Sequence, residues 1–275
     1  NIILDPVFIF VFGMGVQGAA LATVISQAIS AIWVICFLTG KQTKLKIKTK
    51  YFKLKASVLL PVCALGVSPF IMNATESAIN IAFNASLSRY GGDVAVGAMT
   101  ILSSIMQLQF MPVQGIAQGA QPIMSFNYGA KKMDRVKKAY HLLLICSFTY
   151  TVIFWLAVEI APGAFVHLFN SSSQELFEMT KWALRIYMAA TGVFGIQLAV
   201  QQVFMALGQA KISLFIACLR KIILLIPLIY ILPHFFADKV FAVFLAEPVS
   251  DFISVTVAAT LFLFNIKKIL KEGEA

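Results

Sequence analysis

The sequence predicts an all-α polytopic membrane protein, and three observations lead to that fold class. Sixty per cent of the residues are hydrophobic and only 12% are charged, and the mean hydropathy is +0.86, a composition typical of chains that span the bilayer several times. The 37 residues from Val94 to Ala130 include no charged side chain. No segment shows the apolar–polar alternation that is typical of strands.

Long apolar runs predict seven complete membrane spans and one partial span, because about 20 residues are needed to cross the hydrocarbon core. In chain order, the predicted segments are 1–12 (partial), 16–39, 57–85, 93–124, 136–163, 175–207, 212–232 and 240–266. Most of these runs are longer than one crossing requires, so we expect tilted helices or extensions beyond the bilayer.

Residues that break or cap helices separate these spans. The third span is divided from the fourth by Tyr-Gly-Gly-Asp at 90–93, and Asn-Tyr-Gly at 127–129 ends the fourth. Ser-Ser-Gln-Glu at 172–175 resembles a capping box that begins the sixth. Gly208 is predicted to end that span, and Pro233 to end the next.

Basic residues alternate along the chain and predict its orientation. Sixteen of the 22 lysines and arginines lie in residues 41–55, residues 131–138, Lys211 and the tail after Asn265. The intervening connections hold only Arg89 and Lys239. Positively charged loops remain cytoplasmic, so topology accounts for the net charge of +10 without a nucleic-acid partner.

A weak internal repeat predicts two lobes of six helices. Residues 15–30 align without gaps to residues 239–254, and six positions are identical. A parallel repeat of this length fits the architecture of many transporters. We therefore expect residues 1–40 to form the last two helices of an N-terminal lobe, the first of them partial. Residues 41–56 form a basic cytoplasmic linker, and residues 57–275 form a C-terminal six-helix lobe with a short cytoplasmic tail. Because Asn1 lies inside an apolar run, we expect four further helices upstream.

Charged residues inside spans are candidates for function, because charge in the membrane is costly. Glu76 lies in mid-span and shares a helical stripe with Asn73, Asn80 and Asn84. One interpretation is a carboxylate that faces a cavity between the lobes and exchanges H⁺ or Na⁺ or attracts a cationic substrate. The alternative is a glutamate satisfied by neighbouring helices.

Glu247 and Asp251 lie one turn apart near the middle of the last span. Two close carboxylates repel, so one would hold a proton or the two would share a cation. The alternative is that they pair with Arg220 or Lys221 of the preceding span. Asp5 either caps or lines the broken end of the first segment.

Further polar residues are candidates for lining a cavity, although such side chains often form interhelical hydrogen bonds instead. These candidates are Gln107, Gln114, Gln118, Gln201, Arg220 and Asp5, and other glutamines occur at positions 109, 121, 197 and 202. The sequence contains no HExxH, GxSxG or phosphate-loop motif. We therefore expect neither an enzyme nor a metal site nor a cofactor.

Three stretches, residues 1–27, 90–107 and 112–139, resemble the multidrug and toxic compound extrusion (MATE) family. The last of them reads PVQGIAQGAQPIMSFNYGAKKMDRVKKA. The resemblance covers essentially the whole chain, as the end of one lobe and all of the second. It implies twelve helices, a central cavity open alternately to each side, and cation-coupled export of lipophilic, often cationic compounds. It also implies a multi-pass protein of the bacterial cell membrane, whose partners are the lipid bilayer, small lipophilic substrates and an N-terminal lobe of the same chain.

The resemblance also bears on single residues. Some family members couple through a glutamate in the first helix of the second lobe, which Glu76 matches. The acidic residue that those members carry in the fourth helix of the lobe is absent around residues 196–202, which argues against a sodium site of that type. The alternatives are a lipid-linked oligosaccharide flippase of the same superfamily and, less favoured, an integral-membrane enzyme. A flippase would need a cationic cavity, for which Arg220 and Lys221 lie in mid-span and Lys181 and Arg185 near the outer end.

Overall fold

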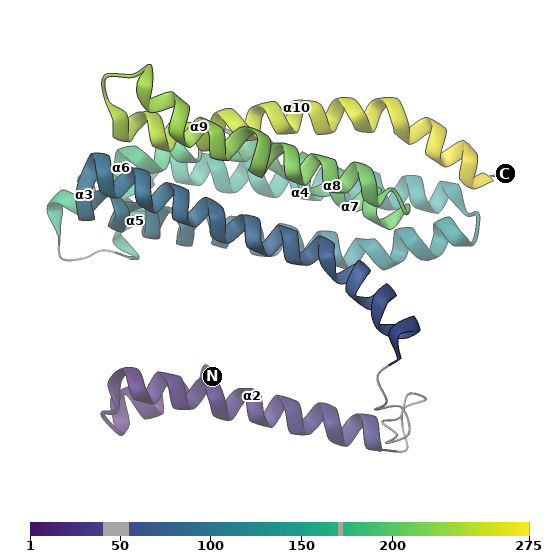
Figure 1. Cartoon of the computed structure of the whole chain (residues 1–275), viewed down its shortest axis with the longest axis horizontal. Helices are drawn as coiled ribbons and strands as arrows, with labels where there is room; N and C mark the ends of the chain where they lie inside the picture. The colour runs from purple at the N-terminus through teal and green to yellow at the C-terminus, as the bar shows by residue number, and fades with distance from the viewer. Residues whose placement is uncertain (41–54, 170–172, 275) are drawn as a thin grey trace. The chain divides into compact units, whose positions relative to one another are not determined.

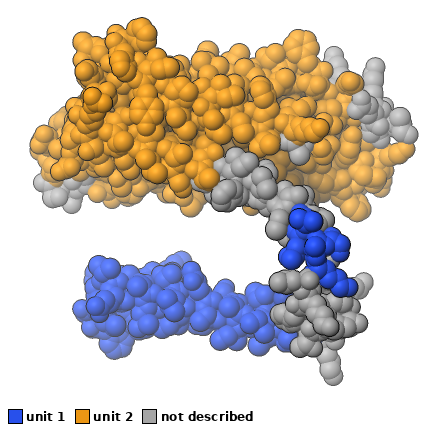
Figure 2. Space-filling view, viewed as in Figure 1, with its two compact units in different colours: residues 1–65 blue, residues 66–275 orange. Residues whose placement is uncertain are grey.

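The computed structural model describes residues 1–40, 55–169 and 173–274, and within these ranges it describes all side chains except those of residues 58, 61–73, 210, 267 and 271–274. The chain divides into two compact units, residues 1–65 and residues 66–275, which Figure 2 colours separately. The boundary lies within the first helix of the predicted second lobe. Most of the predicted linker, residues 41–54, lies outside the described residues.

Unit 1 contains a broken helix followed by a long one. A short turn, α1 (Leu4–Pro6), continues as a π-helical turn, η1 (Val7–Val11), and α2 (Gly15–Thr39) follows. Close packing explains one glycine of α2, because a Cβ on Gly18 would lie 2.8 Å from the backbone oxygen of Phe8. The predicted partial and complete spans at this end of the sequence correspond to these two segments.

Unit 2 begins within α3 (Ala56–Gly129), which is two helices joined at Gly92. As one straight helix, its 74 residues would extend for about 110 Å, far beyond one membrane crossing. Gly92 has φ +63° and ψ −159°, a conformation essentially restricted to glycine. The two arms pack together, since Phe83 of the first and Leu102 of the second belong to one core. The break predicted at 90–93 is confirmed.

Two helices and a broken span follow (Figure 1). They are α4 (Met133–Ile160), the short α5 (Pro162–His167), α6 (Gln174–Tyr187) and α7 (Thr191–Ala206). Ser173 caps α6, because its hydroxyl oxygen accepts a hydrogen bond from the backbone N–H of Leu176 at 3.3 Å. The predicted single span 175–207 is instead a pair of helices bent by 51°.

The last two spans lie side by side. The first is built from α8 (Ala210–Cys218), the π-helical η3 (Leu219–Leu225), α9 (Ile226–Ile231) and the 3₁₀ turn η4 (Leu232–His234). The second is α10 (Lys239–Glu274), which contains Pro248. The chain therefore reverses after Pro233, as predicted. The two repeat segments begin helices at aligned residues, Gly15 in α2 and Lys239 in α10.

Two apolar cores hold unit 2 together. One joins both arms of α3 to α6, α9 and α10, and Phe83, Leu184 and Phe244 are fully buried in it. The other joins α4, α7 and the second half of α10 around Phe204. Within the described residues, five helices are long and apolar enough to cross a membrane, or six if α6 and α7 count as one span. The 56-residue candidate Ala74–Gly129 includes the break at Gly92, with part of the first arm of α3 and all of the second. These long apolar helices confirm the all-α polytopic fold.

Candidate functional site

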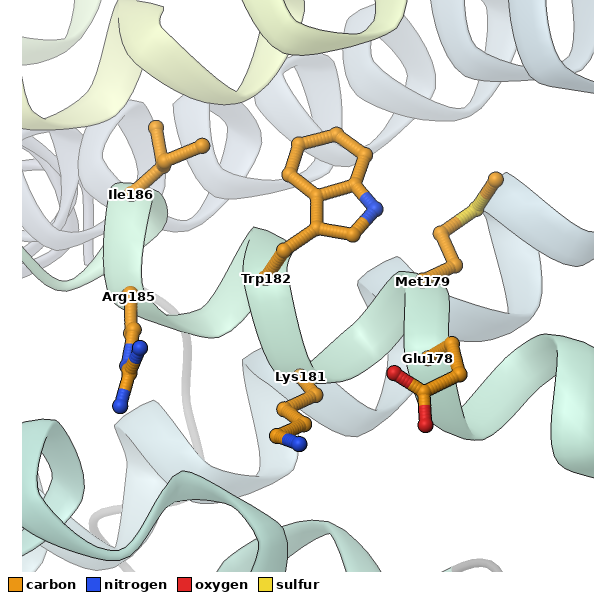
Figure 3. A pocket seen from close by; sticks show the side chains of 6 residues that line it. All are labelled: Glu178, Met179, Lys181, Trp182, Arg185 and Ile186. Carbon is orange, nitrogen blue, oxygen red and sulfur yellow. The ribbon is translucent and has the colours of Figure 1, made fainter.

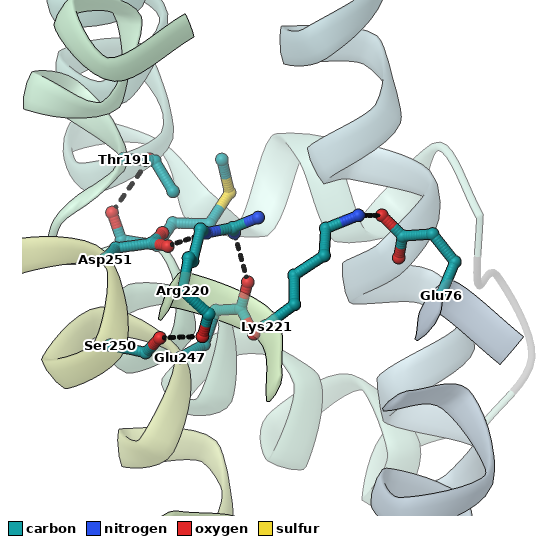
Figure 4. Close-up of polar contacts among 8 residues, drawn as sticks. Glu76, Thr191, Arg220, Lys221, Glu247, Ser250 and Asp251 are labelled. Atoms are coloured by element: carbon teal, nitrogen blue, oxygen red, sulfur yellow. Dashed lines mark hydrogen bonds and ion pairs between the residues drawn. The ribbon is translucent and has the colours of Figure 1, made fainter. Parts of the chain in front are cut away.

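The candidate site is centred on η3, where the helix widens for seven residues in the middle of a span. In a π-helix, the backbone hydrogen bonds run from residue i to i+5, and such turns occur frequently at functional sites. Two adjacent cations, Arg220 and Lys221, lie on this turn and contact different helices (Figure 4).

Arg220 binds both acidic residues of α10. Its Nε donates to Asp251 Oδ1 at 2.5 Å, and its Nη2 donates to Glu247 Oε1 at 2.7 Å. The two carboxylates can meet one guanidinium because residues four apart share a helix face. All three side chains are buried, and Asp251 is fully so. Of the two interpretations for this acidic pair, the structure shows the pairing with Arg220.

Two further contacts fix the arginine. Its guanidinium carbon lies 4.3 Å from the centre of the Phe194 ring, a cation–π contact from α7. The Ser250 hydroxyl donates to the backbone oxygen of Arg220 at 2.8 Å, which satisfies a carbonyl within the π-turn. Figure 4 shows Arg220 of η3 lying against Glu247, Ser250 and Asp251 of α10.

The cluster of Arg220, Glu247 and Asp251, called here the acid cluster, has an unbalanced charge. Two carboxylates face one guanidinium, so the fully ionised cluster carries a net charge of −1. One oxygen of each acid, Glu247 Oε2 and Asp251 Oδ2, is buried without a hydrogen-bond partner in the described part of the chain. Buried charge that is not compensated is costly, so the cluster would be stabilised by a bound proton or monovalent cation.

Lys221 extends the other way and pairs with Glu76 of α3. The Glu76 side chain is 54% exposed, whereas that of Lys221 is 14% exposed. Glu76 therefore lies at the open edge of the site. Its carboxylate is accessible to a ligand, but it already forms an ion pair with the Lys221 ammonium group.

The remaining predicted residues lie around this site or apart from it. Asn80 is exposed one turn from Glu76, and the side chain of Asn73 lies outside the described residues. Gln107, Gln114 and Gln118 are exposed on the second arm of α3, while Gln201 of α7 is half-buried. Asp5 belongs to unit 1, where its Oδ1 is buried without a partner among the described residues.

Part of this arrangement has no clear signal in the sequence. Lys221 lies on the span that precedes Glu247 and Asp251, so the sequence predicts an ion pair with those acids and not with Glu76. Phe194 and Ser250 give no signal, since one lies in an apolar run and the other is a single hydroxyl. The mid-span arginine is the best available clue, because a buried cation needs an anionic partner. Within the described ranges, no three His, Cys, Asp or Glu side chains are grouped so that they could hold a metal ion.

Residues 69–231 match the family model described as MatE, and this match covers more than half of the chain. The chain belongs to the MatE family. This family consists of membrane transporters, so the predictions of a MATE-type transport protein and of no enzyme are confirmed. The acid cluster has one member inside the matched region, Arg220, and two beyond it in α10.

Relatives of this MatE chain include proteins named for drug export. It is 24% identical over 263 residues to the multidrug export protein MepA of Staphylococcus haemolyticus (strain JCSC1435), covering 95% of this chain and 57% of that protein. It is 27% identical over 236 residues to the MepA protein of Staphylococcus aureus (strain N315), covering 86% and 51%. The chain thus spans about half the length of the curated relatives it matches.

Solved structures confirm the fold. A multidrug resistance MATE family transporter of the MOP superfamily in an outward-facing conformation matches with a TM-score of 0.82 at 22% identity, over 99% of this chain and 60% of that one. A MATE structure in complex with MaL6 gives a TM-score of 0.83 at 22% identity, over 99% and 61%. A MOP superfamily transporter from Pyrococcus furiosus, described as having a binding pocket of reverse polarity, gives 0.83 at 22% identity, over 98% and 60%.

Proposed function

We propose that this MatE chain forms the second lobe, and the end of the first, of a cation-coupled antiporter of the bacterial cell membrane. The antiporter exchanges H⁺ or Na⁺ for lipophilic, often cationic compounds by alternating access, with an N-terminal lobe as its partner. The names of the MepA relatives support export of drugs. The surplus carboxylate of the acid cluster supports the coupling.

Charge balance is the observation that supports cation coupling most directly. The acid cluster holds a net charge of −1 in a buried site, where an uncompensated ion is unfavourable. Binding of one proton or one sodium ion makes the cluster neutral, and its release restores the charge. An ion that enters down a potential of 100 mV supplies about 2.3 kcal/mol, which corresponds to a roughly fiftyfold substrate gradient.

Glu76 is proposed to bind the exported cation. Its carboxylate is half-exposed and pairs with Lys221, so a cationic compound must displace that ammonium group. Lys221 is the next residue after Arg220, and release of one side chain can therefore alter the turn that carries the other. This connection would link substrate binding at the edge to ion binding in the buried cluster.

The test is drug efflux by the complete protein in everted vesicles of a drug-sensitive host. We expect Glu247→Gln and Asp251→Asn to abolish or shift the dependence of efflux on pH or sodium. Glu76→Gln should weaken transport of cationic substrates more than that of neutral ones. Glu175→Gln is a matched control, because Glu175 is exposed in the first turn of α6. Unchanged ion dependence in both acid-cluster variants, together with unchanged transport of cationic substrates in Glu76→Gln, would reject the proposal.

A lipid-linked oligosaccharide flippase is less well supported. Such a transporter needs cations free to bind phosphate groups. Arg220 is buried and bound by two carboxylates, and Lys221 is paired with Glu76. The mid-span cations of this chain are thus already neutralised by its own acids.

A further inference from the structure

An apolar groove lies on unit 2 between α4, the α6–α7 break and α10. It has a volume of about 810 Å³, within the range of about 300–1,000 Å³ that is usual for small-molecule sites. Its walls are apolar, and its charged lining residues are Glu159 and Arg185. Representative wall residues are Trp155, Gly192, Val193, Leu245, Val249 and Phe252.

A second cavity of about 570 Å³, lined by both charged and apolar side chains of α6, shares two lining residues with the groove, Arg185 and Ile186. Figure 3 shows how α6 divides its side chains there. Glu178, Lys181 and Arg185 extend from one side of the helix, and Trp182 and Ile186 extend from the other. The charged rim and the apolar groove therefore meet along one helix.

The charged rim, formed by Glu159, Glu178, Lys181 and Arg185, lies at the C-terminal end of α4, and the predicted topology gives its depth in the membrane. Arg185 Nη2 donates to the backbone oxygen of Glu159 at 3.2 Å, and Glu159 is the penultimate residue of α4. The opposite end of α4 lies within the basic residues 131–138, which the positive-inside rule places in the cytoplasm. The rim accordingly lies at the outer surface of the bilayer.

The length of the groove matches one leaflet. Its lining on α10 extends from Phe241 to Ile253, twelve residue steps that rise by about 18 Å. One leaflet contributes about 15 Å of hydrocarbon, half of a core about 30 Å thick. An acyl chain that enters at the rim would fit along this length.

The α6–α7 break forms part of the groove wall. Small residues occupy the wall at the break, with Ala189 and Ala190 before α7 and Gly192 in its first turn. A Cβ on Gly192 would lie only 3.1 Å from the Trp155 ring, so this ring forms the floor. Neighbouring apolar side chains are exposed, Ile153 at 62% and Phe252 at 64%, as expected for a surface that faces lipid.

We propose that this groove binds one zwitterionic phospholipid of the outer leaflet. One acyl chain lies in the groove beside Trp155 and Val249. The phosphate lies against Lys181 and Arg185, and the headgroup ammonium lies near Glu159 and Glu178. Charge complementarity selects this occupant, because the rim offers two cations and two carboxylates above an apolar groove. Trp155 and Trp182 also suit this depth, since tryptophan is enriched at the membrane interface.

Native mass spectrometry of the complete protein, purified in mild detergent, tests the proposal by counting retained lipids. We expect one phosphatidylethanolamine per chain, held several-fold more tightly than phosphatidylglycerol. Arg185→Gln with Lys181→Gln should weaken retention by about tenfold or more, because charge-assisted hydrogen bonds to phosphate are lost. Arg185→Lys should retain most of the binding. Lys239→Gln is the control, since Lys239 is an exposed cation at the start of α10, two residues before the groove lining begins at Phe241.

A second pair of variants tests the groove itself. Val249→Trp should fill it and remove the bound lipid, whereas Leu263→Trp, on an exposed part of α10, should not. Lipid retention that ignores both the charge and the filling variants would overturn the site. Tighter binding of phosphatidylglycerol, or a retained molecule without phosphate, would overturn the assigned occupant.

Discussion

At the scale of single residues, two neighbours in the chain serve different partners. Arg220 is buried against Glu247 and Asp251, and Lys221 reaches the exposed Glu76. The two ion-pair sites are therefore expected to contribute differently to stability. The buried pair must remain intact for stability, while the outer pair can open at little cost because solvent screens it.

We expect Arg220→Met to destabilise the protein by about 3–5 kcal/mol, since it leaves two buried carboxylates without a cation. Thermal unfolding of the complete protein in detergent measures this loss. Lys221→Met is the matched control and should cost less than about 1 kcal/mol, because its partner is 54% exposed. A triple variant that also carries Glu247→Gln and Asp251→Asn should recover most of the lost stability. Equal melting temperatures for Arg220→Met and wild type would show that the cluster does not hold the helices together.

At the scale of elements, the α6–α7 break is held by side chains of other helices. Gln109 Nε2 of α3 donates to the backbone oxygens of Thr151 and Thr191 at 3.3 and 3.2 Å. The Thr151 hydroxyl of α4 donates to the oxygen of Gly192 at 2.8 Å. These bonds connect the first turn of α7 to α3 and α4. For Gln109 the structure therefore shows the interhelical role, one of the two alternatives for such glutamines.

Close packing next to the break predicts a sensitive glycine. A Cβ on Gly195 would lie 2.6 Å from both the Ser147 oxygen and Thr151 Oγ1, so Gly195→Ala forces α4 and α7 apart. We expect a loss of about 1–3 kcal/mol in unfolding free energy, measured by thermal unfolding. Gly119→Ala is the control, because a Cβ there would have nothing within 4 Å and alanine favours helix. A Gly195→Ala protein as stable as this control would contradict the packing described.

The reversal between the two arms of α3 predicts a second sensitive glycine, for a different reason. Gly92 has open space around it but φ +63°, so Gly92→Ala introduces backbone strain of about 1–3 kcal/mol. Gly115→Ala provides the control, with a helical backbone and open space. Folded yield and melting temperature should fall for the first variant alone. A similar fall in both would assign the effect to something other than backbone strain.

The ends of helices were predictable because the signals are local. Glycine at 92 and the serine cap at 173 occur at the predicted boundaries. The break after Tyr187 was not predicted, since Met188, Ala189 and Ala190 carry neither glycine nor proline. The side chains that form hydrogen bonds beside this break belong to Gln109 and Thr151, which are distant in the chain. The pairing of Glu76 with Lys221 was missed for the same reason, as 145 residues separate them.

At the scale of the whole molecule, the orientation in the membrane is a prediction from charge. Cysteine labelling tests it in the complete protein after the native cysteines are replaced. Lys132→Cys should react with a membrane-impermeant thiol reagent only from the cytoplasmic side, and Ala237→Cys only from the outside. Both positions are exposed between helices, so burial does not confuse the result. Labelling of both from one side would show that the topology is wrong, and with it the leaflet assigned to the lipid groove.

The acid cluster also has an evolutionary consequence. Because both buried acids bind Arg220, loss of the arginine leaves two buried carboxylates that only further changes can compensate. The three positions should therefore be inherited as a unit, kept together or replaced together across divergent lineages. Glu76 is 54% exposed, so its pair with Lys221 contributes less to stability and these two positions are freer to vary separately.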